Sequence, residues 1–367
     1  MRRRLALALL PLLLAAAPAT AKRLRYPQFP PLPPVPVDTA NPPTAAKRNL
    51  GIALFFDVRL SGSGTTACTN CHVYNTHFQD NLVKPRPDTS RGQDFFTLKF
   101  NTESLLNIAH RKWFFRDGRL QDLGKAMTEP WIEDNQQLGK TRPEAATALA
   151  AILRSKPGYA AMFRRAFGTD IGKLSDAEVF DLAGKALAVF VRQVVTKPTP
   201  FDRWNAYEGK VPDAAARGVA LFVGKAGCVG CHFGPNFSDD AFHNVSTSPP
   251  VNGVRADEGR FDVTGLEQDR GAFLTPTLRQ VTMTSPYFHD GSALTLLDVV
   301  NHLDAHAADD PNHDPAVGAQ LGLSDQDKAD LLAFFQTLRG PATILRAPTG
   351  PLCNDAAVAA FRTTLPR

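Results

Sequence analysis

The sequence lacks the runs of alternating polar and apolar residues that are typical of half-buried β-strands. Its apolar residues recur at helical spacing instead, so we predict an all-α fold. After the first 21 residues it also lacks an apolar stretch long enough to be a transmembrane helix. The excess of positive charge is small, since the net charge of +5 includes three arginines at positions 2–4 and is +2 without them. We therefore expect no nucleic-acid-binding surface and no membrane span beyond those first residues.

The first 21 residues have the pattern of a secretory signal peptide. Arg2–Arg4 is a positive segment, Leu5–Ala17 is a short apolar segment, and Ala19–Ala21 is an A-x-A cleavage site. About thirteen apolar residues are too few to cross a bilayer comfortably. We predict cleavage after Ala21 and a soluble, periplasmic product. An uncleaved membrane anchor is the alternative.

Cysteine is scarce as well, which excludes a dense disulfide framework and makes its placement informative. Four of the five cysteines fall in two C-x-x-C-H motifs, Cys68–His72 and Cys228–His232. This motif is the attachment signature of a c-type haem, in which each cysteine forms a thioether with a porphyrin vinyl group and the histidine binds the iron. A zinc site would need four ligands, and a thioredoxin-like pair does not need the adjacent histidine. We predict two covalently bound haem c groups, attached through Cys68, Cys71, His72, Cys228, Cys231 and His232.

The fifth cysteine lies apart from both motifs. Cys353 is in the C-terminal tail, and it is expected to be an inert thiol or a partner in an intermolecular disulfide.

The order of helical patterns predicts two domains of the same plan. Prolines dominate residues 22–43, an extended arm that precedes an N-terminal haem domain at 44–200. A C-terminal haem domain at 201–341 and a tail at 342–367 follow. Each domain begins with a helix that leads into its C-x-x-C-H motif and ends with a capped helix. We therefore expect two cytochrome c-like haem domains in tandem.

Capping residues and prolines mark several helix boundaries. The segment Ser175–Glu178 is a capping box for a helix that Pro198 and Pro200 end. In the second half, Asp213 is predicted to cap the helix before the second motif. Ser324–Asp327 caps the closing helix.

Several further segments lie in a characteristic order around the two motifs. They are Leu54–Ser61, Asn101–Asn107, Asp117–Arg119, Gly218–Phe222, Gly234–Asp239, Asp269–Phe273, Thr275–Arg279 and Pro286–Gly291. Together they span nearly all of the chain after the signal peptide, and their order resembles the di-haem bacterial cytochrome c peroxidase family, including its methylamine-utilisation (MauG-like) branch.

The resemblance implies an enzyme, a cytochrome-c peroxidase-like oxidoreductase that reduces hydrogen peroxide to water. The haem on His72 would meet peroxide, and the haem on His232 would accept electrons from a small c-type cytochrome or cupredoxin. Two alternatives stay open: a MauG-like oxidase of a protein or small substrate, and a non-catalytic di-haem electron-transfer protein. The family often forms dimers, so a homodimer is a further expectation.

The resemblance also predicts an accessible iron at the first haem. The position of the distal histidine that some relatives carry falls near Asp88, and the segment Val83–Gly92 has neither histidine nor methionine. We therefore expect this haem to be five-coordinate or readily opened.

The catalytic positions depart from the family pattern. Gln137 stands where many relatives have a glutamate, and an amide can hydrogen-bond peroxide but cannot accept its proton. Glu133, or alternatively Glu129 or Asp134, could take that role, unless these acids are solvated loop charges. Arg116 stands where relatives often have a tryptophan that relays electrons between the haems, and arginine has no accessible redox chemistry.

The sixth ligand of the second haem is a further departure. The position of the methionine or tyrosine of relatives falls on Leu303, which cannot bind iron. His302 is favoured as the ligand over His306, with Met283 or an open site as alternatives. His243 is expected to be a packing or haem-propionate contact.

The family also implies a calcium ion between the domains. The matching positions are Asn101, through its side-chain oxygen, and Thr284 and Pro286, through their carbonyls. Oxygen ligands of this kind suit calcium.

Overall fold

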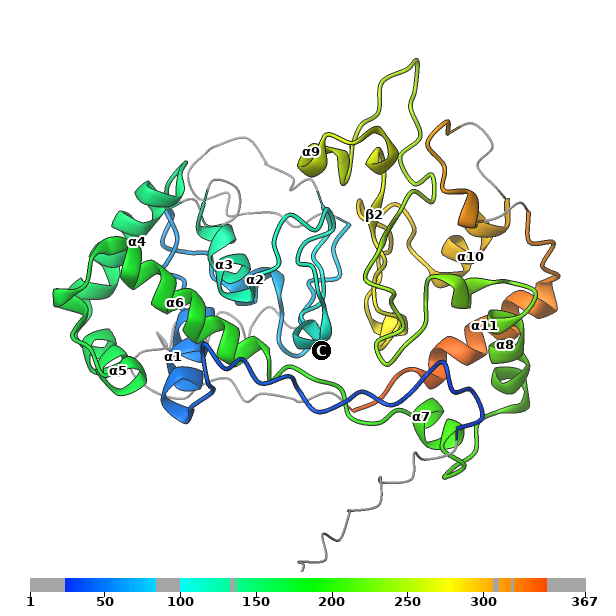
Figure 1. The fold of residues 1–367 in the computed structure, drawn as a ribbon, viewed down its shortest axis with the longest axis horizontal. Helices are drawn as coiled ribbons and strands as arrows, with labels where there is room; N and C mark the ends of the chain where they lie inside the picture. The colour runs from blue at the N-terminus through cyan, green and yellow to red at the C-terminus, as the bar shows by residue number, and fades with distance from the viewer. Residues whose placement is uncertain are drawn as a thin grey trace, which may run out of the picture.

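The computed structural model describes residues 24–83, 100–132, 136, 138–305, 310–317 and 320–341. Within these ranges the fold is mostly helical, with one short antiparallel ribbon of β1 (Phe242–His243) and β2 (Phe273–Leu274). The helices gather into two lobes, with α1 to α6 in one and α7 to α11 in the other (Figure 1). None of the helices described is long and apolar enough to cross a membrane. The predicted all-α fold is therefore confirmed in its helices, and the β1–β2 ribbon departs from it.

The N-terminal lobe is built around one buried cluster drawn from residues 50–194. Its helices are α1 (Ala45–Phe56), α2 (Cys68–Cys71), α3 (Leu123–Thr128), α4 (Arg142–Ser155), α5 (Pro157–Phe167) and α6 (Asp176–Val191), with 3₁₀ turns η1 (Ile108–His110), η2 (Glu129–Trp131) and η3 (Ile171–Lys173). Ser175 accepts from the backbone of Glu178 as the first half of a capping box, so the predicted start of α6 is confirmed.

The C-terminal lobe has a second buried cluster, drawn from residues 201–338 and Phe29. Its helices are α7 (Pro200–Asn205), α8 (Asp213–Val223), α9 (Phe261–Thr264), α10 (Leu296–Ala305) and α11 (Asp325–Thr337), with 3₁₀ turns η4 (Cys228–Gly230), η5 (Glu267–Asp269), η6 (Val281–Met283) and η7 (Pro315–Val317).

Two boundary predictions in this region were wrong. The helix expected to end at Pro198 and Pro200 already ends at Val191, and Pro200 is instead the first residue of α7, where a missing N–H costs nothing and Thr199 supplies the cap. Asp213 is the first residue of α8 rather than its cap, and Pro212 is the cap without a side-chain bond. The carboxylate of Asp213 instead lies in the first turn, where the helix dipole favours negative charge.

In each lobe, the helix that precedes the C-x-x-C-H motif crosses the last helix of the lobe at a glycine. A Cβ added to Gly51 in α1 would overlap the carbonyl of Ala186 in α6 and lie 2.8 Å from Cβ of Phe190. A Cβ added to Gly218 in α8 would overlap the carbonyl of Asp330 in α11 and lie 2.9 Å from Cβ of Phe334. The two lobes therefore repeat the same close helix contact, as expected of an internal duplication.

The N-terminal arm joins the two lobes. The dark-blue segment in Figure 1 starts beside α7 and runs along the molecule to α1. Tyr26 N–H donates to Oδ1 of Asn205 at 2.7 Å, and Phe29 lies in the C-terminal cluster, 1% exposed. Further along, Asn41 donates to the carbonyl of Lys185 in α6 at 2.9 Å. The arm is therefore an integral strap between the lobes rather than a free extension.

Candidate haem sites

The first C-x-x-C-H motif forms the short helix α2. The backbone N–H of His72 donates to the carbonyl of Cys68 at 2.8 Å and closes the turn of the motif. Nδ1 of His72 lies 3.2 Å from the carbonyl of Phe78. A carbonyl can only accept, so Nδ1 carries the proton and Nε2 keeps its lone pair for a metal.

The second motif repeats this arrangement in η4. The N–H of His232 donates to the carbonyl of Cys228 at 2.9 Å, and its Nδ1 donates to the carbonyl of Phe237 at 2.9 Å. The same tautomer is therefore fixed at both motifs. Neither acceptor carbonyl could be found from the sequence, because any residue supplies one.

Burial sets the charge state of the motif residues. It lowers the pKa of His72 and of His232, so both imidazoles are neutral at pH 7. It raises the pKa of Cys68, Cys71 and Cys228 to about 12, so these side chains are thiols rather than thiolates. Neutral imidazole is the form that binds iron, and neutral thiols can add to vinyl groups.

A cavity of about 400 Å³ lies beside the second motif. Cys228, Cys231 and His232 form part of its wall, and Leu278, Val299, Leu303 and Phe335 are among its apolar lining residues. A wall of two cysteine side chains and an imidazole, enclosed by aliphatic and aromatic side chains, fits a covalently bound haem.

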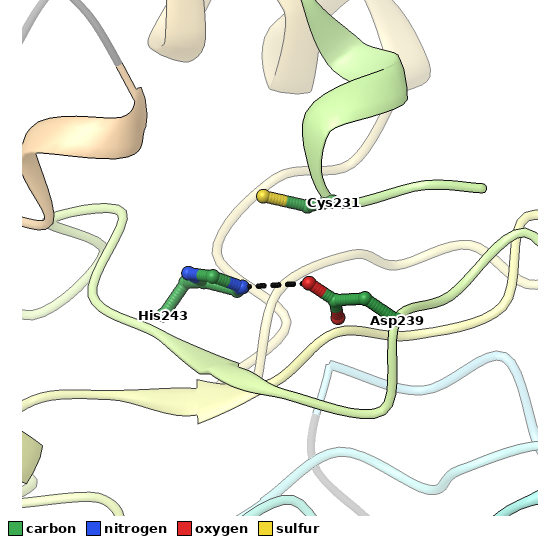
Figure 2. Close-up of side chains that lie close together, drawn as sticks. All are labelled: Cys231, Asp239 and His243. Atoms are coloured by element: carbon green, nitrogen blue, oxygen red, sulfur yellow. Dashed lines mark hydrogen bonds and ion pairs between the residues drawn. The ribbon is translucent and has the colours of Figure 1, made fainter.

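The imidazole of His243 lies next to this motif and interacts with two carboxylates, of which Asp239 is drawn in Figure 2. Its Nε2 lies 3.0 Å from Oδ2 of Asp239 and its Nδ1 lies 2.5 Å from Oδ2 of Asp314. Asp239 first, then Cys231 and Asp314, raise the pKa of His243 to about 11. Cys231, Asp239 and His243 could together hold a metal ion by their spacing, but a thioether bond to haem would remove Cys231 from that set.

The candidates for the sixth iron ligand differ in whether they line the cavity and in what their side chains already contact. Leu303 lines it, whereas Nε2 of His302 donates to the carbonyl of Val245 at 2.8 Å and its ring packs edge-on against Phe288. Iron ligation by His302 would require this bond to break, so the arrangement does not favour it. His306 lies outside the described residues. Met283 lies in η6.

Sequence reasoning missed a buried histidine on the cavity wall. His289, of the segment Pro286–Gly291, is 4% exposed and stacks on Phe273 with ring centroids 3.9 Å apart. Its Nδ1 lies 3.2 Å from Oγ1 of Thr247, and its Nε2 lies 3.7 Å from Oδ2 of Asp257. The available signal was that His289 belongs to the Pro286–Gly291 segment, one of the segments that carry the family resemblance.

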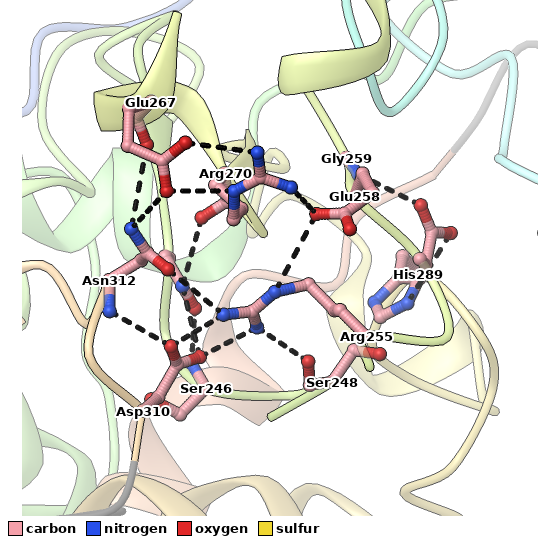
Figure 3. Close-up of polar contacts among 12 residues, drawn as sticks. Ser246, Ser248, Arg255, Glu258, Gly259, Glu267, Arg270, His289, Asp310 and Asn312 are labelled. Carbon is pink, nitrogen blue, oxygen red and sulfur yellow. Dashed lines mark hydrogen bonds and ion pairs between the residues drawn. The ribbon is translucent and has the colours of Figure 1, made fainter. Parts of the chain in front are cut away.

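A buried ion-pair network holds the segment that carries His243 (Figure 3). Arg255 donates to the two carboxylate oxygens of Asp310 at 2.7 and 2.6 Å, and Asn244 donates to Asp310 at 3.0 Å. The side chains of Arg255 and Asp310 are 3% and 0% exposed. Burial alone would raise the pKa of Asp310, but the bonds from Arg255 and its neighbours lower it overall. The network therefore fixes the loop after β1 beside the cavity.

Two expected catalytic residues, Gln137 and Glu133, lie outside the described residues, as does Asp134. Glu129 is described and lies 3.9 Å from Arg142. Their neighbour Gln136 is buried, and its Nε2 donates to the carbonyls of Leu60 and Thr66 at 3.2 Å each. Gln136 thereby fixes the turn that leads into the first motif, a role that no sequence pattern indicates.

The third expected catalytic residue, Arg116, lies between the two lobes. Its backbone carbonyl accepts from Leu274 N–H at 2.8 Å, and its guanidinium lies on the cavity wall. Nε of Arg116 lies 3.5 Å from Oε1 of Glu103, which also pairs with Arg111 at 3.3 Å. Burial alone would raise the pKa of Glu103, but Arg111 and Arg116 lower it overall.

The residues expected to bind calcium do not fit that ion. Nδ2 of Asn101 donates to the carbonyl of Pro286 at 2.8 Å, and Oδ1 of Asn101 accepts from Arg116. Calcium needs oxygens that converge on one point, whereas here one expected oxygen faces an amide and another faces a cation. Thr284, the third expected position, lies on the cavity wall.

Two lobes of the same helical plan, each with a C-x-x-C-H motif and a histidine held in the same tautomer, define the class of a di-haem c-type cytochrome. Residues 45–210 match the family model described as di-haem cytochrome c peroxidase. The chain is 33% identical to cytochrome-c peroxidase IdrP1 of Denitromonas iodatirespirans over 93% of this chain and 92% of that one. It is 34% identical to the methylamine utilization protein MauG of Methylorubrum extorquens over 86% and 85%, and 30% identical to cytochrome c551 peroxidase of Nitrosomonas europaea over 87% and 88%.

Solved structures agree with this grouping. A MauG-like protein associated with microbial copper homeostasis matches with a TM-score of 0.73 and 26% identity, over 91% of this chain and 99% of that one. The diheme peroxidase BthA of Burkholderia thailandensis shares the fold, with a TM-score of 0.67 and 19% identity over 85% and 94%. The chain belongs to the di-haem cytochrome c peroxidase family, and it is a cytochrome-c peroxidase-like oxidoreductase. The family implies two haem c cofactors.

Proposed function

We propose that this chain is an exported di-haem peroxidase that reduces hydrogen peroxide to water with electrons from a small redox protein. The balanced step takes two electrons and two protons per peroxide and gives two waters. Two observations support this proposal. Relatives named cytochrome c peroxidases align with most of the chain, and Nδ1 of the histidine in each motif contacts a backbone carbonyl in the same way. Each lobe would be one haem domain, with the boundary near residue 200.

The two sites would divide the work. The haem held by Cys68, Cys71 and His72 would supply the iron that cleaves the oxygen–oxygen bond, and the haem held by Cys228, Cys231 and His232 would receive electrons. Phe233 follows the second motif and is 43% exposed. An exposed apolar ring next to an electron-accepting site suits a transient contact with a small c-type cytochrome or cupredoxin.

Proton movement at the first site would fall to the segment around Gln137. Its amide can hold peroxide by a hydrogen bond, and the carboxylate of Glu133 can take the proton from one peroxide oxygen and return it to the other. Glu133→Gln should slow turnover by about 10²–10⁴-fold, the usual contribution of a general acid–base. Gln137→Glu should raise the rate, since it restores a carboxylate.

Electrons would pass between the lobes without a side-chain relay at Arg116. The guanidinium cannot be oxidised, and it instead pairs with Glu103 and Asn101. Its part would be to hold the segment between the sites in place.

Peroxide-dependent oxidation of a reduced small c-type cytochrome tests the proposal. We expect two cytochromes oxidised per peroxide, and loss of turnover in a Cys68→Ser, Cys71→Ser chain. A Cys228→Ser, Cys231→Ser chain should still react with peroxide once but lose turnover with the donor. Peroxide that leaves both haems unchanged, before and after one-electron reduction, would support an electron carrier instead.

A MauG-like oxidase is the second candidate, favoured by the 34% identity to MauG. It would consume peroxide while oxidising a protein or small substrate, with little turnover of a reduced cytochrome. The same assay separates the two functions. A signal peptide at residues 1–21 and a homodimer belong to the proposal and are tested by N-terminal sequencing of the secreted protein and by its size in solution.

A further inference from the structure

The junction between the lobes contains a positive side chain where the family would place a metal ion. We propose that the guanidinium of Arg116 takes the place of calcium, so that this chain joins its lobes through an internal cation and needs no bound calcium. The proposal rests on the contacts of Arg116 and Asn101 and does not depend on the peroxidase function.

Arg116 is held by groups that would otherwise suit a cation. Its Nη2 donates to Oδ1 of Asn101, and its Nε lies 3.5 Å from the carboxylate of Glu103. The side chains of Arg116 and Glu103 are 14% and 21% exposed, so water screens this pair only in part. A calcium ion bound through the side-chain oxygen of Asn101 would lie against this guanidinium and be repelled by it.

The orientation of Asn101 is fixed from both sides. Its Nδ2 faces the carbonyl of Pro286 at 2.8 Å, which can only accept, and its Oδ1 faces Arg116, which can only donate. Turning the amide over would place two acceptors together on one side and two donors on the other. The two oxygens expected to share a calcium ion therefore cannot point at one site while Arg116 is present.

The contacts of this cluster cross the junction at several points. Asn101 N–H donates to the carbonyl of His289 at 2.9 Å, and Leu274 N–H donates to the carbonyl of Arg116 at 2.8 Å. Arg116 and Asn101 thus connect the segment after the first motif to β2 and to the Pro286–Gly291 segment. These are the connections that a bridging ion would otherwise provide.

Calcium content and thermal unfolding of the holoprotein test the proposal. After passage through calcium-free buffer, the wild-type chain should contain far less than one calcium per molecule by elemental analysis. Its midpoint of unfolding should shift by less than about 1 °C between excess chelator and millimolar calcium chloride. Arg116→Gln should unfold at a lower temperature, and calcium should then raise its midpoint by roughly 2–4 °C.

Arg116→Lys is the matched control, because it keeps the positive charge and should stay insensitive to calcium. One calcium per wild-type chain, or a wild-type midpoint that falls in chelator, would overturn the proposal. An Arg116→Gln chain that is as stable as wild type, or that shows no calcium response, would also overturn it. If Arg116→Gln does not give folded holoprotein, the wild-type measurements decide alone.

Discussion

At the scale of single residues, a buried ion pair outside the haem motifs joins Arg279 to Asp202. Arg279 donates to both carboxylate oxygens of Asp202, at 2.8 and 2.9 Å, and to the carbonyl of Pro235 at 2.6 Å. The two paired side chains are 1% and 5% exposed. Removing one partner would leave a buried charge without compensation, which costs more than the pair itself contributes.

We predict that Arg279→Leu lowers the free energy of unfolding by about 3–5 kcal/mol, because the carboxylate of Asp202 would stay buried and lose its partner. Denaturant unfolding of the holoprotein measures the change. The matched control is Arg164→Leu, because the Arg164–Asp170 pair is 64% and 40% exposed and its loss should change the free energy of unfolding little. Equal losses in the two variants would contradict the argument.

The Arg279–Asp202 pair should also make the free energy of unfolding depend on pH. Burial alone would raise the pKa of Asp202, but the bonds from Arg279 and Thr199 lower it overall, below its ordinary 3.8. A lowered folded-state pKa stabilises the protein above the unfolded pKa, and this contribution is lost as the pH falls through the folded value. The difference in unfolding free energy between wild type and Arg279→Leu should therefore be full at pH 7 and shrink below about pH 4. A difference that is the same at pH 7 and pH 3 would refute the prediction.

Some residues of the sites could be predicted from the sequence and others could not. Cys68–His72 and Cys228–His232 were predictable because covalent haem attachment demands those residue types at that spacing. The carbonyls of Phe78 and Phe237 that orient the histidines were not, because backbone acceptors carry no residue signature. The Arg116 contact with Asn101 was missed for another reason, since it depends on which two segments the fold brings together across the junction.

At the scale of elements, capping boxes and glycines define the helices and their crossings. Ser175 and Ser324 begin α6 and α11 as the sequence predicted, because a cap is a local interaction. Pro200 was misinterpreted, since α6 ends before it at Val191 and this proline begins the next helix, a position that proline also favours. The glycine crossings could not be recognised from the sequence, because nothing local shows which backbone lies against Gly51 or Gly218.

Gly218→Ala should lower the free energy of unfolding by about 1–3 kcal/mol, since the added methyl group would force α8 away from the carbonyl of Asp330. Gly51→Ala should have a similar effect in the N-terminal lobe. The control is Gly172→Ala, where the nearest atom would be a side-chain oxygen of Asp170 at 3.4 Å. Thermal unfolding of the three chains compares them. A Gly218→Ala chain as stable as the control would show that the two helices do not pack this closely.

At the scale of the whole molecule, the N-terminal arm and the junction hold the lobes together. Composition predicted an extended arm at residues 22–43, but not that Phe29 would enter the C-terminal core while Asn41 binds α6 in the other lobe. Phe29 stacks on Phe237, with ring centroids 4.8 Å apart, just after the second motif. A single aromatic residue in a proline-rich segment carries no pattern that would reveal its destination.

Phe29→Ala should therefore destabilise the C-terminal lobe by about 3–5 kcal/mol, the usual cost of emptying a buried aromatic site. Loss of the second haem's spectral signature on addition of denaturant, compared with that of the first, would report which lobe responds. Val37→Ala, at a side chain that is 69% exposed, is the control and should change little. Equal sensitivity of both variants would mean that the arm does not anchor the core.

The central claim is that each lobe holds one covalent haem through its own motif, and the intact mass of the denatured holoprotein tests it most directly. The account predicts a mass increase equal to two haems in the wild type, and to one haem in either the Cys68→Ser, Cys71→Ser chain or the Cys228→Ser, Cys231→Ser chain. A wild-type mass that carries one haem or none would contradict it.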